Sequence, residues 1–348
     1  MADSITEHRT FTTDHLQLEN GAFLENVVIA YRAMGTLSSS RDNVVLITHG
    51  NTSGPQMLDP SCTSGEGIWS DIVGPGKAID TDRFYVICPN MLGSSYGSTN
   101  ASSINSSTNR PYGSEFPEIT VADIVTTQKL LVDSLEVKEL ITVAGPSYGG
   151  FQAFQWAVSY PDFMRGIVAA VSSPVVPTVQ AEDNFGKILA VLSKNPVWNN
   201  GNYYGAADKL ISTMTNLRID TLKKYGHEQQ LAEISTDNSN IESIIKDEAV
   251  QWAKEFDANS LLILARALLN YNILNDADKI KAKVLYALSS TDKVFSPKLA
   301  DMVMPALIAA GVDAEYLLIE SELGHMASGD KDAEKWISTL RRFVEGLV

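Results

Sequence analysis

Hydrophobic positions in the first half of the chain alternate between short strand-like runs and segments with helical spacing. Residues 43–48 and 84–88 are short runs rich in Val and Ile, which predict two buried parallel strands. Apolar residues recur near helical spacing over 121–135, a strand pattern returns over 140–144, and 151–159 again predicts a helix. Strands that alternate with helices predict a mostly parallel sheet with helices on both faces.

The pattern changes between residues 174 and 277. Strand-like runs disappear there, and amphipathic helical segments such as 241–256 and 260–270 replace them. The strand pattern resumes at 283–288 and 314–319, and the chain closes on an amphipathic helix over 331–347. These patterns predict an α/β core formed by residues 1–173 and 278–348, with a helical cap, 174–277, inserted into it.

Composition narrows the class of protein. With 348 residues and 44% hydrophobic content, the chain can bury the core of one large α/β domain with an insertion. The net charge of −15 and the lack of a basic run argue against a nucleic-acid partner. No apolar run of about 18 residues and no basic-then-apolar N-terminus are present, so neither a membrane span nor a secretory signal is expected, and a cytoplasmic location follows.

Two cysteines, Cys62 and Cys88, are too few and too far apart for a four-ligand zinc site. We interpret them as buried or partly buried thiols, and the sequence predicts no metal and no cofactor.

A candidate nucleophile lies in the run Gly145-Pro146-Ser147-Tyr148-Gly149, which fits the pattern G-x-S-x-G. The run follows a predicted strand and precedes a predicted helix, which is the context of a nucleophile elbow. Glycines on both sides of Ser147 permit a strained turn that exposes the hydroxyl above the sheet. An ordinary loop serine is the competing interpretation, and the strand-turn-helix context favours the elbow.

A serine hydroxyl needs an adjacent base, which in this arrangement follows the last strand. His325 is the histidine at that place. His8 and His15 are expected to precede the first strand, and His227 falls in the predicted cap. His49, at the end of a predicted strand, is interpreted as structural.

An acid must orient the base, and the expected chain order is Ser, then Asp or Glu, then His. Asp292 fits this order at the C-terminal end of the predicted strand 283–288, where such sheets place functional loops. Asp301 and Glu320 are competitors, but Asp301 is expected in a helix and Glu320 at the end of the strand next to the histidine loop.

The tetrahedral intermediate of acyl transfer needs backbone donors for its oxyanion. One donor is expected from Tyr148, which follows the nucleophile, and the other from the loop 49–52, where Asn51 is the preferred residue. Together with the element order, these positions predict the α/β-hydrolase fold.

The sequence also resembles the homoserine O-acetyltransferase family of α/β hydrolases over most of its length. The matching stretches are residues 81–90, 92–93, 96–99, 102–105, 110–113, 116–120, 128–131 and, in the cap, 195–203. The resemblance implies a triad of Ser147, Asp292 and His325, a covalent acyl-enzyme, and a homodimer formed through the cap helices.

Three departures from that family bear on the acyl acceptor. The family elbow usually reads Gly-Gly-Ser-Met-Gly-Gly, whereas this chain has Pro146 and Tyr148. Transacetylases of the family usually carry an acidic residue directly after the histidine, where this chain has Met326. They also keep an Arg in a Leu-Ala-Arg cap helix, and the comparable stretch here, 210–218, ends at Arg218 in a different context.

An amino-acid zwitterion needs a charged partner at both ends, because desolvating unpaired charges costs several kcal/mol. The departures therefore predict a serine carboxylesterase that hydrolyses small short-chain acyl esters, such as alkyl acetates, through an acyl-serine. Homoserine O-acetyltransferase activity with acetyl-CoA is the first alternative. A binding protein on a disabled hydrolase scaffold is the second, and the complete set of triad residues argues against it.

Overall fold

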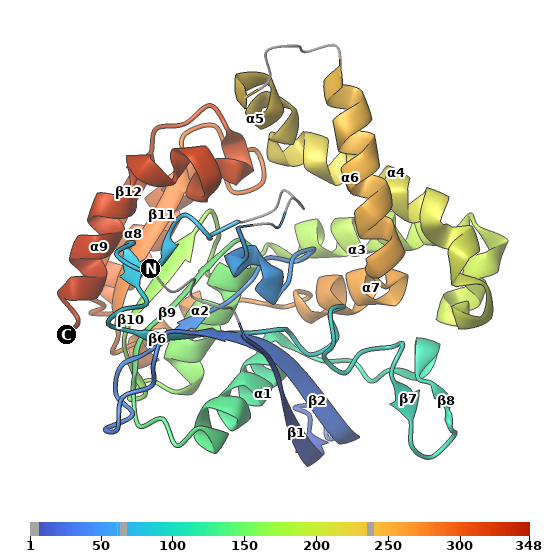
Figure 1. Cartoon of the computed structure of the whole chain (residues 1–348), viewed down its shortest axis with the longest axis horizontal. Helices are drawn as coiled ribbons and strands as arrows, with labels where there is room; N and C mark the ends of the chain where they lie inside the picture. The colour runs from blue at the N-terminus through green and yellow to red at the C-terminus, as the bar shows by residue number, and fades with distance from the viewer. Residues whose placement is uncertain (1–6, 61, 63–67, 235–239) are drawn as a thin grey trace.

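An eight-stranded sheet forms the centre of the molecule (Figure 1). The computed structural model describes residues 7–60, 62, 68–234 and 240–348. The strand order is β1-β2-β6-β3-β9-β10-β11-β12; β2 is antiparallel to both neighbours, and every pair from β6 to β12 is parallel. The strands are β1 Glu7–Gln17, β2 Phe23–Met34, β3 Val44–Ile47, β6 Tyr85–Pro89, β9 Leu140–Pro146, β10 Met164–Ala170, β11 Lys283–Ser289 and β12 Ala314–Ile319. Two small ribbons pair β4 Val73–Gly74 with β5 Ile79–Asp80 and β7 Ile104–Asn105 with β8 Arg110–Pro111.

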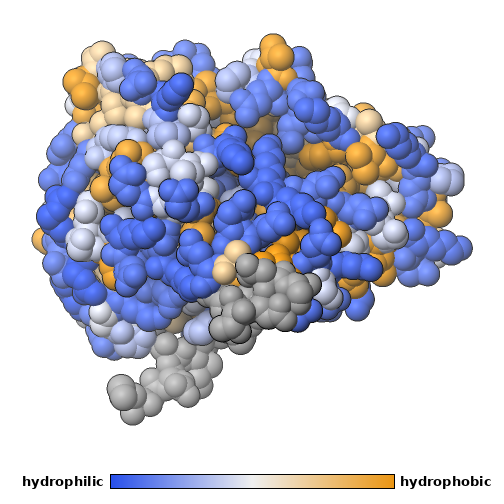
Figure 2. Space-filling model, turned by 90° about the horizontal axis from the view of Figure 1, so that it is seen from above, coloured by the Kyte–Doolittle hydropathy of each residue, from blue (hydrophilic) through white to orange (hydrophobic). Residues whose placement is uncertain are grey.

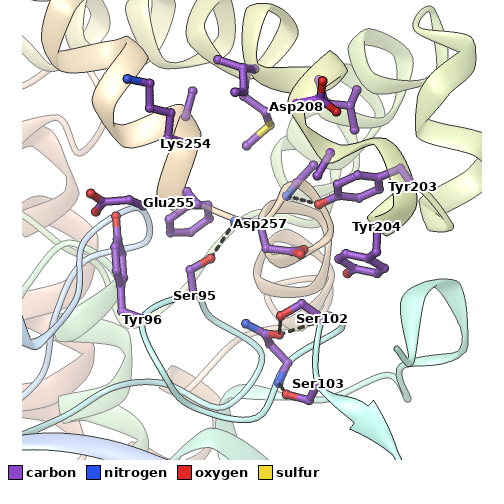
Figure 3. Close-up of a pocket in the computed structure, with 18 of the residues that line it drawn as sticks. Ser95, Tyr96, Ser102, Ser103, Tyr203, Tyr204, Asp208, Lys254, Glu255 and Asp257 are labelled. Carbon is purple, nitrogen blue, oxygen red and sulfur yellow. Dashed lines mark hydrogen bonds between the residues drawn. The ribbon is translucent and has the colours of Figure 1, made fainter. Parts of the chain in front are cut away.

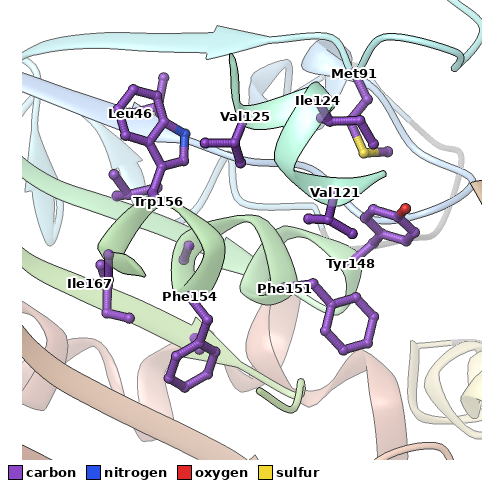
Figure 4. Close-up of a cluster of buried hydrophobic side chains, with 14 of the residues drawn as sticks. Leu46, Met91, Val121, Ile124, Val125, Tyr148, Phe151, Phe154, Trp156 and Ile167 are labelled. Atoms are coloured by element: carbon purple, nitrogen blue, oxygen red, sulfur yellow. The ribbon is translucent and has the colours of Figure 1, made fainter. Parts of the chain in front are cut away.

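Successive strand residues point to opposite faces of the sheet, and each face has its own hydrophobic core. On β3, Val44 and Leu46 enter one core while Val45 and Ile47 enter the other. Helices α1 (Val121–Ser134), α2 (Tyr148–Ser159) and α8 (Ala300–Ala309) cover the first face, and Figure 4 shows α1 and α2 side chains packed over it. Helix α9 (Ile337–Glu345) covers the second. The predicted fold class, a mostly parallel sheet with helices on both faces, is confirmed.

Helices occupy the chain between β10 and β11, as the sequence predicts. They are α3 Thr178–Ser193, α4 Ile211–Tyr225, α5 His227–Ile234, α6 Ile241–Glu255 and α7 Ala258–Ala267. These helices, called the helical segment below, gather to one side of the sheet (Figure 1). Seen from above, the molecule is mostly hydrophilic, with apolar side chains gathered in a hollow near the middle (Figure 2). The division into core and cap domains and the homodimer through the cap stay predictions.

The main sheet and the last helix differ in part from the sequence expectation. The sequence pattern does not predict β1, β2 and β10 of the main sheet or the two small ribbons, and His8 and His15 lie inside β1 rather than before the first strand. Strand β1 is mostly exposed, so it carries little of the hydrophobic pattern that identifies a strand. The helix expected over 331–347 is interrupted at Trp336, which is fully buried with its ring centroid 6.0 Å from that of Trp69.

Within the described part of the chain, no helix has the length and apolar character needed to cross a membrane. The same residues contain no group of three His, Cys, Asp or Glu side chains placed to hold a metal ion. Cys88 is buried and Cys62 partly buried, as expected, and neither forms a disulfide. The cytoplasmic location stays a prediction.

Candidate active site

A sharp turn carries Ser147 between β9 and α2. Its backbone has φ 54° and ψ −121°, a region that costs a non-glycine residue of order 1–3 kcal/mol. The turn lies tight against the loop after β3, because a Cβ on Gly145 or on Gly149 would lie 2.2 Å from the carbonyl oxygen of Thr48. The Ser147 N–H donates to the Ala170 carbonyl at 2.9 Å, which anchors the turn to β10. These contacts hold the sharp strand-turn-helix that the sequence pattern predicts around Ser147, and the role of Ser147 as nucleophile stays a prediction.

The loops after β9, β11 and β12 bring three predicted residues into one hydrogen-bonded chain. His325 lies in a short 3₁₀ turn, Gly324–Ser328, after β12. Its Nε2 is 2.9 Å from Ser147 Oγ, and its Nδ1 is 2.8 Å from Asp292 Oδ2. The side chains of His325 and Asp292 are only 2% and 0% exposed. A shielded Asp-His-Ser chain of this geometry can remove a proton from the serine hydroxyl.

The Asp292 carboxylate is held by its own loop as well as by the histidine. Its Oδ1 accepts hydrogen bonds from the backbone N–H groups of Val294 at 2.7 Å and Phe295 at 3.1 Å. The other oxygen, Oδ2, therefore faces His325, whose Nδ1–H donates to it. The two competitors lie elsewhere: Asp301 is exposed in the first turn of α8, and Glu320 is exposed just after β12.

The two predicted oxyanion donors lie on elements that contact each other. Tyr148 is the first residue of α2, where a backbone N–H has no acceptor within the helix. Asn51 lies in the loop after β3, and that loop is tied to α2 because Thr48 Oγ1 donates to the Gly149 carbonyl at 2.8 Å. Gln152 Nε2 also donates to the carbonyl of His49 at 3.1 Å. The oxyanion roles of Tyr148 and Asn51 stay predictions.

Side chains of the helical segment are hydrogen-bonded to the loop that carries Asn51. Arg218 of α4 donates from Nη1 to Thr52 Oγ1 at 2.6 Å, and Trp252 of α6 donates from Nε1 to the Thr52 carbonyl at 2.9 Å. The Arg218 side chain is buried, and its guanidinium carbon lies 5.2 Å from the centre of the Trp252 ring. The carboxamide oxygen of Asn51 is buried without a hydrogen-bond partner in the described residues.

His49 is a buried structural residue, in agreement with its interpretation from the sequence. Its Nδ1 lies 2.9 Å from the carbonyl oxygen of Gly50, and its Nε2 accepts from the backbone N–H of Met91 at 3.1 Å. Burial lowers the pKa of His49 from 6.5 to about 4. The ring is therefore neutral near pH 7 and joins the loops after β3 and β6.

Two aromatic rings lie against the imidazole of His325. The Tyr225 ring, at the end of α4, is 4.6 Å from it between centroids, and the Phe295 ring, in the loop after β11, is 5.6 Å away. Met326 is buried in a cluster with Tyr225 and Leu323. Nothing in the sequence pattern singles out Tyr225 or Phe295, because their contact with His325 arises only when distant segments pack.

A cavity of about 580 Å³ lies between the loop after β6 and helices α4, α6 and α7 (Figure 3). Asp257 points into it, and burial raises the pKa of this carboxyl above its ordinary value. Two wall residues, Tyr96 and Phe256, pack edge to face at 5.7 Å, and Phe256 stacks at 4.7 Å on Trp252. Ser147, Asp292 and His325 do not line this cavity. The row of rings ends at Trp252, which is hydrogen-bonded to Thr52 in the loop after β3.

Comparisons with known proteins show the fold and the family of the chain. The family model described as the alpha/beta hydrolase fold matches residues 43–332. A homoserine O-acetyltransferase of Methanosalsum zhilinae is 34% identical over 90% of this chain and 68% of its own length. One from Deferribacter desulfuricans is 32% identical over 92% of this chain and 90% of its own length.

The solved structures of an esterase and of a homoserine O-acetyltransferase resemble the chain almost equally. The structure of esterase E22 superposes with a TM-score of 0.85 at 27% identity, covering 98% of this chain and 100% of that one. Homoserine O-acetyltransferase from Bacillus anthracis superposes with a TM-score of 0.85 at 25% identity, covering 98% of both chains.

The fold, the elbow and the family match define the protein as an enzyme of the α/β-hydrolase class. Within that class, the chain belongs to the homoserine O-acetyltransferase family. The relatives in sequence are named as transferases, whereas the structural neighbours include proteins named as esterases, so the comparisons leave the acyl acceptor open.

Proposed function

We propose that the protein is a serine carboxylesterase that hydrolyses small short-chain acyl esters, such as alkyl acetates, through an acyl-serine. The observation that carries the proposal is the hydrogen-bonded chain from Ser147 through His325 to Asp292, at 2.9 and 2.8 Å. Both steps of such a reaction need a serine with an adjacent, oriented base.

In the first step, Ser147 Oγ attacks the ester carbonyl while His325 Nε2 takes the hydroxyl proton. The oxyanion accepts hydrogen bonds from the backbone N–H groups of Tyr148 and Asn51. The intermediate then expels the alkoxide, which leaves as the alcohol with the proton from His325. In the second step, water attacks the acyl-serine with His325 again as base, and the collapse releases the carboxylic acid and restores Ser147.

The apolar surroundings of Met326, the residue after His325, favour water as the acyl acceptor. Met326 offers an uncharged thioether and is buried with Tyr225, Leu323 and Val294. A substrate ammonium at this place would lose its hydration without gaining a carboxylate partner from residue 326, which is unfavourable. An uncharged ester incurs no such cost.

The test compares hydrolysis of ethyl acetate with CoA release from acetyl-CoA in the presence and absence of L-homoserine. We expect acetate release from the ester and no homoserine-dependent CoA release. Ser147→Ala should abolish ester hydrolysis and labelling by a phosphonofluoridate probe. The matched control is Ser159→Ala, an exposed serine at the end of α2, which should match wild type. Substantial turnover by folded Ser147→Ala would refute the proposal.

A second candidate, homoserine O-acetyltransferase, is favoured by one observation beyond the named relatives. The buried guanidinium of Arg218 lies at the loop that carries Asn51, with Nη1 2.6 Å from Thr52 Oγ1. A cation in this position can hold the carboxylate of an amino-acid acceptor. Under this candidate the acyl group passes from acetyl-CoA to Ser147 and then to the homoserine hydroxyl.

Arg218→Met separates the two candidates. If the protein is a transferase, wild type shows robust homoserine-dependent CoA release, and the variant raises the KM for homoserine by at least about tenfold, the scale of a lost charged hydrogen bond. The control is Arg266→Met, on the half-exposed Arg266 of α7, which pairs with Glu118 away from the loop. Wild type without homoserine-dependent release would exclude the second candidate.

A further inference from the structure

The hydrogen bonds of His325 restrain one motion of its ring only weakly. Nδ1 is bonded to Asp292 and Nε2 to Ser147, so both bonds lie at the ring nitrogens and in the plane of the imidazole. They fix where the two nitrogens point. They resist rocking of the ring about the line between the nitrogens only weakly, because that motion changes neither distance. Besides the covalent bond to Cβ, contacts against the ring faces add to this restraint.

Two aromatic rings from different parts of the fold supply such contacts. The Tyr225 ring lies 4.6 Å from the imidazole centroid at an interplanar angle of 47°, and the Phe295 ring lies 5.6 Å away at 35°. Tyr225 ends α4 in the helical segment, whereas Phe295 follows β11 in the sheet. The base is therefore in contact with both parts of the molecule.

Each ring is itself anchored. After Tyr225, α4 ends at Gly226 with φ 95°, where a Cβ would lie 2.7 Å from the carbonyl oxygen of Leu323, so the helix end presses on the loop that carries the base. The backbone N–H of Phe295 donates to Asp292 Oδ1 at 3.1 Å, and its ring packs edge to face on Phe151 of α2 at 5.6 Å. Tyr225 also packs with Leu323 and Met326, so both rings are packed beside neighbours of the candidate triad.

We propose that Tyr225 and Phe295 are positioning residues for the base: they hold the His325 ring in its productive tilt and stabilise the imidazolium that forms when Ser147 loses its proton. This inference rests on the serine-histidine chemistry of the proposed function. Both centroid distances fall within the roughly 6 Å over which a cation is attracted to an aromatic face. The stabilisation acts on the charged transition state and leaves the neutral resting ring nearly unaffected, so it raises the rate more than it tightens substrate binding.

The test measures the second-order rate constant for phosphonylation of Ser147 by a phosphonofluoridate probe, which needs the activated serine but no knowledge of the acyl acceptor. Tyr225→Leu and Phe295→Leu should each slow the reaction roughly 5- to 30-fold, the factor that about 1–2 kcal/mol produces at 1.36 kcal/mol per decade. Tyr225→Phe keeps the ring and should restore the rate to within about twofold of wild type. Phe185→Leu, which removes a ring from α3 beside Arg266, should not change it.

Steady-state hydrolysis of a short ester gives the second readout. We expect kcat to fall by a similar factor in both leucine variants while KM changes by less than about twofold. Thermal melts and circular dichroism show whether each variant folds, and Phe295→Leu keeps the test open if loss of Tyr225 unfolds the helical segment. Two folded leucine variants that react with the probe within twofold of wild type would overturn the inference.

The probe also separates this inference from the proposed function. Wild type that reacts rapidly with the probe but does not hydrolyse short esters would refute the esterase proposal alone, and the phosphonylation rates of the variants would still decide the role of the rings. Wild type inert toward the probe would overturn both.

Discussion

Replacing Asp292 by Asn changes one atom of the candidate triad, and the structure dictates how the new side chain must sit. In the native protein, Oδ1 accepts from the backbone N–H groups of Val294 and Phe295. An amide nitrogen cannot accept these bonds, so the Asn oxygen must stay there and its NH₂ group must face His325. The NH₂ group donates to Nδ1, which forces the imidazole proton onto Nε2. A ring with its proton on Nε2 points that proton at Ser147 and cannot act as its base.

The expected loss follows from this wrong tautomer. In a serine triad, the change from Asp to Asn lowers kcat by about 10⁴ while the geometry is kept, which corresponds to about 5 kcal/mol of transition-state stabilisation at 1.36 kcal/mol per decade. Substrate binding does not use the carboxylate, so KM should change little. The fold should be retained, because both backbone hydrogen bonds to Oδ1 survive.

The assay is kcat and KM for hydrolysis of a short ester, together with the rate of phosphonylation of Ser147. Asp301→Asn is the matched control: it makes the same chemical change at an exposed carboxylate of α8 that sequence order alone allows as the triad acid. We expect wild-type rates from this control. A folded Asp292→Asn variant within tenfold of wild type would refute the assignment of Asp292 and the tautomer argument with it.

Two further predictions concern the scaffold of the site. Gly149→Ala places a Cβ 2.2 Å from the Thr48 carbonyl oxygen and should lower the free energy of unfolding by about 3 kcal/mol or more. The control is Gly186→Ala on α3, where the new Cβ meets nothing within 4 Å, and it should be neutral or stabilising. Equal urea midpoints for the two variants would contradict the close approach at Gly149. The pKa of His49 is lowered from 6.5 to about 4 on folding, so the unfolded chain binds a proton in this range that the native state does not. The contribution of His49 to the free energy of unfolding should be fully present above pH 6.5 and should fall by roughly 3 kcal/mol as the pH drops to 4. In urea melts, His49→Gln should lose less stability over that interval than wild type. The same pH dependence in both proteins would contradict the buried neutral ring.

Much of the fold follows from local sequence pattern. The strands and helices expected around Ser147 appear within a few residues of their expected bounds, because β-branched runs and helical spacing reflect burial on a sheet face or a helix stripe. The pattern failed at β1, where most residues are exposed, and at β10, which is almost entirely buried but contains a glycine and two alanines, residues that are depleted in strands. It also failed at Trp336, which is buried against Trp69 at the break in the last helix.

The sequence by itself determined the candidate triad residues, since G-x-S-x-G after a strand, the order Ser, Asp, His, and one histidine after the last strand are all features of chain order. Only the tertiary structure joined them at hydrogen-bond distance and decided which oxygen of Asp292 faces His325. It alone placed Tyr225 against His325. Such contacts join segments far apart in the chain, and they depend on how the helices pack over the sheet, which local hydrophobic pattern does not encode.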